Sequence, residues 1–381
     1  MALFRRFALK VLILCVHFAP ETGAQALQAT KVADALHDAG CSVRVVCGVS
    51  STAQHDARYP VQRVPRASER PATGVFGRIG RRLRYEWTAI DAQSEWVRRM
   101  AIEAGRIATV FEPDVVLTQS TPFAVHLIGL HLPPELKRKW IAYFSDLWPL
   151  ALTPRPYRTT FSVLFKPLQM RALKQVAEHA RGFIFSNAVA VRRLADALAS
   201  RATPACAVIP HIGMPAPDAA SSTVLSLRYA TRFVHVGKVT RERVCTELIE
   251  ALRVFDARWS AHGFTGITFV GDVDSSFRRA CADLERAGVV DFVGEVSPDV
   301  AQAISMAAKA LVVIEARMDE SPFLASKFAD YAMLGKPVLA ICPPGPMRDF
   351  LVAHGGGVAV PHDRARIIGA IDELIRGGPR G

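Results

Sequence analysis

Residues 321–341, SPFLASKFADYAMLGKPVLAI, contain a helix that leads directly into a strand. Ser326, Lys327 and Asp330 stand near the start of the expected helix, and the turn GKP ends it before the apolar run VLAI. Glycine and proline end helices, and a short apolar run bounded in this way is typical of a buried strand. The charges at the helix start face either water, as in any surface αβ unit, or a charged ligand that is rich in hydroxyl groups.

The same alternation of helix and apolar run continues along the whole chain. The runs are VLILCVHF, SVRVVCG, DVVLTQS, WIAYFSD, GFIFS and CAVIPH in the first half, and RFVHVG, ITFVGD, DFVGEV, ALVVIEA and PVLAICP in the second. This order predicts an α/β protein with parallel sheets that are covered on both faces. A Pro-, Ala- and Ser-rich stretch separates the two sets, so we expect two Rossmann-like, doubly wound domains, 1–212 and 232–381, joined by a linker at 213–231. Ligands bind beyond the carboxyl ends of strands in such sheets, which predicts a site in a cleft where the domains face one another.

The beginning of the chain permits two interpretations. A basic start, an apolar stretch and Ala24-Gln25-Ala26 resemble a secretory signal peptide with its cleavage site. The same apolar stretch, residues 10–18, also reads as the first strand of a βαβ unit. Cleavage would remove this strand and leave the next helix and strand without a partner, so we favour the strand.

Composition and charge limit the class of protein. The 381 residues are 50% apolar, yet no apolar run reaches the roughly 20 residues of a membrane span. Seven scattered cysteines, without a CxxC pair, indicate reduced thiols in a cytoplasmic protein and argue against a structural zinc. The sequence Asp272-Val273-Asp274 imitates a metal-binding motif but is expected to form a turn.

The formal net charge of +12 indicates an anionic partner or surface. Residues 58–106 are strongly basic, and their arginines are interleaved with apolar side chains at roughly helical spacing: Phe76, Ile79, Leu83, Trp87 and Trp96. One interpretation is a helix that lies on the anionic headgroups of the inner membrane face, and the other is a core-facing helix with a solvated basic face. Nucleic acid is a weaker candidate because no recognised binding motif or stacking platform accompanies the charge.

A second basic motif, FVHVGKVTRERVC, starts at residue 233. An expected strand ends at Gly237, where the absence of a side chain lets a phosphate approach the backbone. Lys238 and Arg243 follow, and both can neutralise a diphosphate near the start of the next helix, although solvated cations in a turn are the alternative. The helix at 326 offers a similar anion site through its free first-turn amides and Lys327, while Asp330 can accept hydrogen bonds from vicinal hydroxyls.

These motifs resemble those of retaining glycosyltransferases of the two-Rossmann-domain GT-B architecture, close to glycosyltransferase family 4 (group 1). The strand-Gly-Lys-x4-Arg start, FVGD, DFVGEV, the 321–341 block and GGGVAV carry the resemblance in the second half. The first half adds HFAPETGAQALQATKVADAL, the SDLWP of residues 145–149 and VIPHIGM. The resemblance covers nearly the whole chain, and the 321–341 block is its most specific part.

The resemblance implies transfer of a sugar from a nucleotide-sugar donor to a lipid-linked or polysaccharide acceptor in cell-surface polysaccharide biosynthesis. It implies retention of configuration, assisted by the departing phosphate, with no metal or other cofactor. The residues that it assigns to the donor are Gly237, Lys238, Arg243, Ser326 and Lys327 for the pyrophosphate and Asp330 for the ribose. A degenerate, non-catalytic subunit, a nucleotide-sugar epimerase of the same fold and an exported two-domain solute-binding protein are the alternatives.

The first domain contributes fewer residues by this resemblance. Asp146 is expected to face the donor sugar, and it would be the general base if the reaction inverted instead. The loop at Gly23 and Ala24 is expected to line the cleft near the sugar or the acceptor. One departure concerns a pair of glutamates that the family often places eight residues apart. Eight residues before Asp330 stands Pro322, so Glu320 or Asp319 is the candidate substitute.

Overall fold

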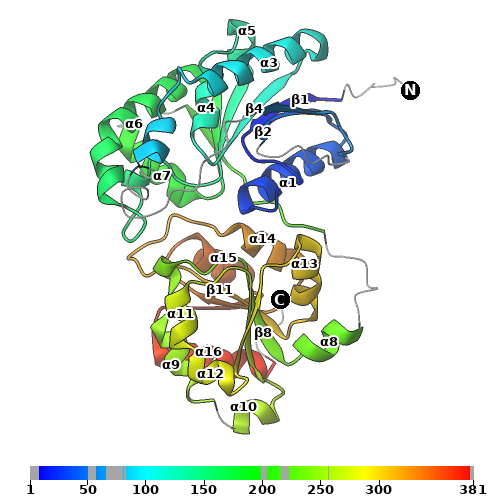
Figure 1. The fold of residues 1–381 in the computed structure, drawn as a ribbon, viewed down its shortest axis with the longest axis vertical. Helices are drawn as coiled ribbons and strands as arrows, with labels where there is room; N and C mark the ends of the chain where they lie inside the picture. Colours follow the sequence, from blue (N-terminus) through cyan, green and yellow to red (C-terminus); the bar gives the residue numbers. More distant parts are fainter. Residues whose placement is uncertain are drawn as a thin grey trace. The chain divides into compact units, whose positions relative to one another are not determined.

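The computed structural model describes residues 8–49, 57–65, 80, 83–198, 204–215, 223–255 and 257–377. The chain forms two compact units (Figure 1). The first consists of Met1–Thr153 and Arg158–Ile212, and the second of Pro154–Tyr157 and Gly213–Gly381. The short segment Pro154–Tyr157 therefore belongs to the second unit, although the chain on either side of it belongs to the first.

The first unit is built on a parallel sheet of seven strands in the order β3-β2-β1-β4-β5-β6-β7. Its strands are β1 (Lys10–Cys15), β2 (Ser42–Val49), β3 (Val61–Pro65), β4 (Val115–Ser120), β5 (Trp140–Phe144), β6 (Gly182–Phe185) and β7 (Ala205–Val208). Its helices are α1 (Ala24–Asp38), α3 (Glu95–Phe111), α4 (Ala124–Gly129), α5 (Pro134–Lys137), the 3₁₀ helix η1 (Leu150–Leu152), α6 (Thr160–His179) and α7 (Ala188–Leu198).

The central strand β1 shows why the runs read as continuously apolar. Its side chains alternate between the two faces of the sheet. Leu12 and Leu14 belong to the core that α3, α4, α6 and α7 cover, while Val11, Ile13 and Cys15 belong to the core under α1. Both faces are buried, so every position of the strand must be apolar.

The second unit repeats this plan with a parallel sheet of six strands in the order β10-β9-β8-β11-β12-β13. Its strands are β8 (Arg232–Val236), β9 (Gly266–Val270), β10 (Val290–Gly294), β11 (Ala310–Ile314), β12 (Val338–Ile341) and β13 (Gly357–Val360). Its helices are α8 (Thr223–Tyr229), η2 (Arg241–Arg243), α9 (Thr246–Leu252), α10 (Ala257–Ala261), α11 (Ser275–Ala280), α12 (Ala282–Arg286), α13 (Pro298–Ala307), α14 (Ser326–Met333), α15 (Pro346–His354) and α16 (Arg364–Ile375).

The prediction of two doubly wound α/β domains is confirmed, because each sheet has the Rossmann strand order with helices on both faces (Figure 1). Two strands differ from the prediction. The first strand ends at Cys15 rather than at residue 18, because its pairing with both neighbours stops there. The edge strand β3 was not predicted, since Gln62 and Arg63 make its sequence read as part of the basic stretch.

The predicted linker, the cysteines and the apolar helices can each be compared with the structure. Part of the segment predicted as a linker forms helix α8, which packs against α13 and β8. All seven cysteines are free thiols. None of the helices that the structure describes is long and apolar enough to cross a membrane.

The basic stretch 58–106 is described only in part, and Phe76 and Ile79 lie outside the described residues. Its helix α3 packs on the core through its apolar face, and Trp96 is partly buried against the same core. Several of its arginines are paired within the first unit. The pairs are Arg58 with Asp34 and Asp38, Arg99 with Glu95, and Arg106 with Glu103. This part of the stretch therefore matches the core-facing helix with a basic outer face.

Candidate functional site

The candidate site lies in the second unit, at the carboxyl ends of β8 and β11. From β8 the chain continues outward on one side through β9 and β10, and then crosses to β11 on the other side. The two strands are thus neighbours at the topological switch point, where loops diverge and ligands bind in open α/β sheets. Gly237 follows β8 and Glu315 follows β11, so both stand at this point.

Lys327, in the first turn of α14, reaches the end of β8. Its Nζ lies 3.2 Å from Nε2 of the buried His235. The other ring nitrogen of His235, Nδ1, lies 3.0 Å from the Val312 carbonyl oxygen and must donate to it. Nε2 is then an acceptor, and Lys327 donates to it. Burial, together with the charges of Lys327 and Arg243, holds the pKa of His235 well below its usual value and keeps this ring neutral.

The charged form of Lys327 is poorly stabilised. Burial, and then the nearby charge of Arg243, lower the pKa of Lys327 to about 7, while the carboxylate of Glu315 acts to raise it. Lys327 therefore exchanges its proton near neutral pH. An anion that binds beside it restores the stabilisation that water would provide, and so favours the charged form.

Gly237 is required for this approach. Its φ of +102° lies in a region that residues with a side chain rarely adopt. A Cβ at this position would lie 3.1 Å from Nζ of Lys327. Glycine thus supplies both the backbone turn after β8 and the space into which Lys327 extends.

Arg243 reaches the site from the short helix η2, and its network includes Tyr157 and Glu315. Its Nε donates to the hydroxyl of Tyr157 at 3.0 Å and lies 3.4 Å from Oε1 of Glu315. Tyr157 in turn donates to the same Oε1 at 2.5 Å, and the Ala316 amide donates to it at 2.7 Å. The hydroxyl of Tyr157 connects the guanidinium and the carboxylate, and this arrangement fixes the direction in which Arg243 points.

Glu315 is the most buried charge of this network, with 1% of its surface exposed. Its second oxygen, Oε2, has no hydrogen-bond partner among the described residues. Burial and the charge of Glu315 raise the pKa of Tyr157, which keeps this hydroxyl protonated and able to donate. A buried carboxylate requires partners, and here Tyr157 and Arg243 supply them.

Lys238 differs from Arg243 and Lys327 in the partner of its charge. Its Nζ lies 2.6 Å from Oδ2 of Asp272, and both side chains are exposed. Asp274, two residues later, caps α11 by accepting from the Ser276 amide at 2.8 Å. Val273, between these two aspartates, forms an isolated parallel bridge with Val239, so the Asp272-Val273-Asp274 sequence does not form the expected turn. Arg243 lies close enough to Lys327 for its charge to lower the pKa of that amine, while Lys238 pairs with Asp272.

The start of α14 carries further predicted donor residues. Ala325 occupies the N-cap position and has no side-chain acceptor, so no side chain caps the helix at Ser326. Asp330, one turn further, accepts from the Met214 amide at 2.8 Å through Oδ1. Part of its hydrogen-bonding capacity therefore holds the chain that enters the second unit. Glu320 lies partly buried in the loop between β11 and α14.

The predicted residues of the first unit lie at the carboxyl end of its own sheet. Gly23 is the exposed N-cap residue of α1, and Ala24 is the first residue of that helix. Asp146 is partly buried and comes two residues after β5. Burial and then the charge of Asp146 raise the pKa of Tyr143 to about 12.

Sequence reasoning missed three members of the cluster. His235 stands inside an apolar strand beside the glycine-cation motif, and Glu315 directly follows another apolar strand, so a polar residue at the end of an apolar run was a usable signal for both. Tyr157 had no such signal. It lies far from Arg243 along the chain, and only the fold brings it there.

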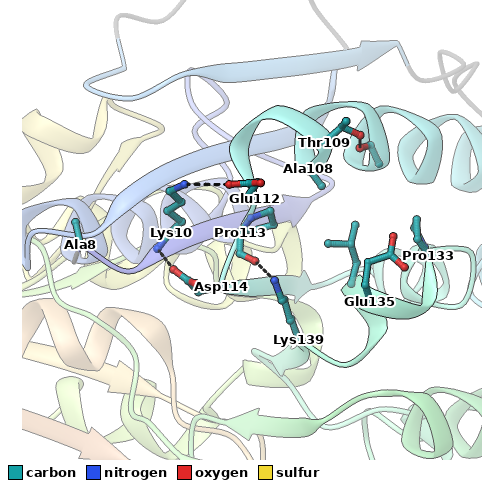
Figure 2. A pocket seen from close by; sticks show the side chains of 12 residues that line it. Ala8, Lys10, Ala108, Thr109, Glu112, Pro113, Asp114, Pro133, Glu135 and Lys139 are labelled. Carbon is teal, nitrogen blue, oxygen red and sulfur yellow. Dashed lines mark hydrogen bonds and ion pairs between the residues drawn. The ribbon is translucent and has the colours of Figure 1, made fainter. Parts of the chain in front are cut away.

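A cavity of about 740 Å³ lies elsewhere, in the first unit (Figure 2). Lys10, Asp114 and Lys139 line it at the amino ends of β1, β4 and β5, opposite the edge where open α/β sheets bind ligands. Its polar groups satisfy one another: the Lys10 amide donates to Asp114 at 2.8 Å, and Lys139 donates to the Pro113 carbonyl oxygen at 2.9 Å. We assign no ligand to it.

Among the described residues, no three His, Cys, Asp or Glu side chains lie together as a metal site would need. His126 is buried against Phe144 and hydrogen-bonds to Thr118 at 2.8 Å, and burial lowers its pKa to about 3. It is a packed core group.

Solved structures with a similar fold match almost the whole chain. Trehalose-6-phosphate synthase from E. coli, bound with UDP-2-fluoro glucose, matches with a TM-score of 0.61 and 10% identity over 97% of this chain and 92% of that one. WaaG, a glycosyltransferase involved in lipopolysaccharide biosynthesis, matches with a TM-score of 0.60 and 14% identity over 96% and 90%. The chain has the GT-B fold.

This fold is shared by proteins of more than one activity. The UDP-GlcNAc 2-epimerase from Methanocaldococcus jannaschii matches with a TM-score of 0.55 and 11% identity over 98% of this chain and 94% of that one. No protein-family model matches the sequence, and no curated protein does. At these identities the likeness concerns the GT-B fold alone, and the activity must be argued from the site.

Proposed function

We propose that this protein is a glycosyltransferase that binds a nucleotide-sugar in its second unit. The observation that supports this most directly is the meeting of Arg243 and Lys327 beside Gly237 at the switch point of the sheet. Two cations, an uncapped helix start and a glycine form a site for a diphosphate. Asp330 then lies one turn along α14, where a carboxylate can accept hydrogen bonds from ribose hydroxyls.

The reaction follows from what these groups stabilise. When the bond between the sugar and the diphosphate breaks, negative charge develops on the departing phosphate, and fixed cations and helix amides aimed at that position lower the barrier. The Tyr157–Glu315 pair holds Arg243 in its direction before the donor arrives. We propose transfer with retention, in which the acceptor hydroxyl attacks on the face that the phosphate leaves, without a metal.

The proposal extends to the class of acceptor. The family resemblance and the structural likeness to WaaG both favour a lipid-linked or polysaccharide acceptor in cell-surface polysaccharide biosynthesis. We propose that Asp146 and the loop at Gly23 and Ala24 contribute to the acceptor side, and that the enzyme works at the cytoplasmic face of the membrane. Analysis of the product's anomeric configuration by NMR decides the stereochemistry: inversion would favour Asp146 as general base.

The first test is a thermal-shift screen against UDP-, GDP-, dTDP- and ADP-sugars. Stabilisation follows occupancy, so one nucleotide class is expected to raise the melting temperature well above the others. An equal lack of response to every nucleotide-sugar at saturating concentration counts against the proposal. The Lys238→Ala variant is expected to keep most of the rise in melting temperature, because the ammonium of Lys238 already pairs with Asp272.

Replacing Gly237 by alanine tests the close approach at the end of β8. The new Cβ would stand 3.1 Å from Nζ of Lys327, and the φ of +102° would strain the backbone by about 1–2 kcal/mol. We expect roughly tenfold weaker nucleotide-sugar binding by isothermal titration calorimetry. Gly335→Ala is the matched control, because its φ is +59° but nothing lies near the added Cβ. A similar loss of affinity in both variants would attribute the effect to general destabilisation.

An epimerase is the second candidate, and the epimerase among the structural matches is the observation that favours it. The two activities differ in what they release. A transferase frees nucleoside diphosphate when an acceptor is present, whereas an epimerase returns an isomerised nucleotide-sugar without one. Incubation with the donor found in the screen, followed by chromatography of the nucleotides, separates the two.

A further inference from the structure

Helix α6 of the first unit has an inverted distribution of side chains in its first half. It exposes Leu164 (69%) and Leu168 (48%), together with Val163, and these form a stripe at helical spacing. The opposite face of the same turns buries the polar residues Ser162 and Gln169. In its second half the helix is ordinary and buries apolar residues. Single exposed apolar residues are common on surface helices, whereas a contiguous apolar stripe marks an interaction site.

The charges around this stripe all have one sign. From residue 158 to residue 171 the sequence contains Arg158, Lys166 and Arg171 and no Asp or Glu. All three cations are exposed, and no described acid pairs with any of them. On α3, by contrast, Arg99 and Arg106 pair with glutamates of their own helix, and Arg98 donates a hydrogen bond to Gln93. Unpaired cations beside an apolar stripe therefore distinguish α6.

A neighbouring helical segment, residues 83–88, extends the same surface. The two are tied by a buried hydrogen bond, in which Nε2 of Gln169 donates to Oε2 of Glu86 at 2.7 Å. The segment exposes Trp87 (55%) and Arg84, so it repeats the pairing of a large apolar side chain with a cation. Tryptophan prefers the boundary between lipid tails and headgroups.

We propose that the first half of α6, with residues 83–88 beside it, is a docking surface for an anionic lipid bilayer. The apolar stripe enters the headgroup region, and the surrounding cations contact anionic headgroups. A stripe of three apolar residues is too small for a stable protein interface, which buries about 800 Å² on each partner. A bilayer needs no shaped partner surface. This proposal rests on the membrane-face location given above, and it assigns that role to α6 rather than to α3.

The test is co-sedimentation of the full chain with vesicles, in the absence of donor and acceptor. Vesicles that contain phosphatidylglycerol are expected to bind the protein, and vesicles of phosphatidylcholine alone to bind it much less. The double variant L164Q/L168Q removes two of the three side chains of the apolar stripe without touching the core, and we expect roughly tenfold weaker partitioning. K166Q/R171Q is expected to lose a similar factor, and the loss should disappear at high salt.

The matched control is Val352→Gln, which changes an 80% exposed apolar residue on α15 of the second unit and is expected to bind vesicles like the wild type. Unchanged partitioning of L164Q/L168Q, or no binding of the wild type to anionic vesicles, would overturn the proposal. A concentration-dependent dimer in analytical ultracentrifugation, lost in L164Q/L168Q, would also overturn it in favour of a second copy as the partner. Donor affinity is measured in parallel without vesicles, so a failure of this surface is distinguishable from a failure of the glycosyltransferase assignment.

Discussion

Replacing Lys327 by methionine is expected to weaken nucleotide-sugar binding by roughly 10- to 150-fold, the loss of one hydrogen bond to a charged group. The same variant is expected to be more stable than the wild type at pH 7. The folded protein holds the pKa of Lys327 at about 7, against an ordinary value of 10.5, so burying this amine opposes folding. Methionine retains an apolar stem of similar length and removes that cost. Affinity and stability should therefore change in opposite directions.

The pH dependence gives this prediction a sign that can be checked. Both phosphates of a nucleotide-sugar keep their charge between pH 6 and pH 9, so Lys327 controls the change in affinity over that range. Binding should be tightest below the free pKa of about 7 and weaken as the pH rises above it. The cost to stability has the same origin: it is complete below pH 7 and fades towards the unfolded value of 10.5.

Calorimetry in buffers of different ionisation enthalpy measures both the affinity and the proton that the wild type takes up at pH 8. Lys327→Met should abolish this uptake. Lys238→Met is the matched control, because it removes a lysine that is adjacent to Gly237 in sequence but already pairs with Asp272. An unchanged pH profile in Lys327→Met would place the diphosphate elsewhere.

Replacing Glu315 by alanine is expected to have the largest effect on stability. The variant deprives Tyr157 and Arg243 of their shared acceptor, and the removal of one member of a buried charged pair costs about 3–5 kcal/mol. Arg243 is partly exposed and keeps some hydration, so we expect the lower end of that range and a melting temperature several degrees lower. Donor affinity should fall as well, because the guanidinium is no longer held in one direction.

Two further variants separate these effects. Glu242→Ala, on the exposed face of η2, removes a nearby carboxylate and should leave both the melting temperature and donor affinity unchanged. Tyr157→Phe keeps the edge-on contact with Phe323, at 5.0 Å between ring centroids, and removes only the hydroxyl. It should weaken donor binding with a smaller loss of stability than Glu315→Ala. Wild-type affinity in Tyr157→Phe would rule out a positioning role for this network.

The class of fold was predictable because its signals are local. Strands such as β1 and β11 are buried on both faces, which requires the continuous apolar runs that sequence periodicity detects. The edge strand β3 was not predicted from the sequence, because an edge strand has fewer neighbours and tolerates polar residues such as Gln62 and Arg63. The ends of strands were not predicted either, since β1 stops where its pairing with β2 and β4 stops, and this depends on residues far along the chain.

By itself, the sequence determined two Rossmann-like sheets and a glycine-cation motif followed, later in the chain, by an uncapped helix start. Local spacing is sufficient for these, because each element forms from its own residues. Only the tertiary structure decided which charges meet. Lys238 adjoins Gly237 yet pairs with Asp272, while Lys327, Glu315 and Tyr157 arrive from three separate segments. Convergence in space depends on strand order and on the paths of loops, and these are settled by the packing of the whole unit.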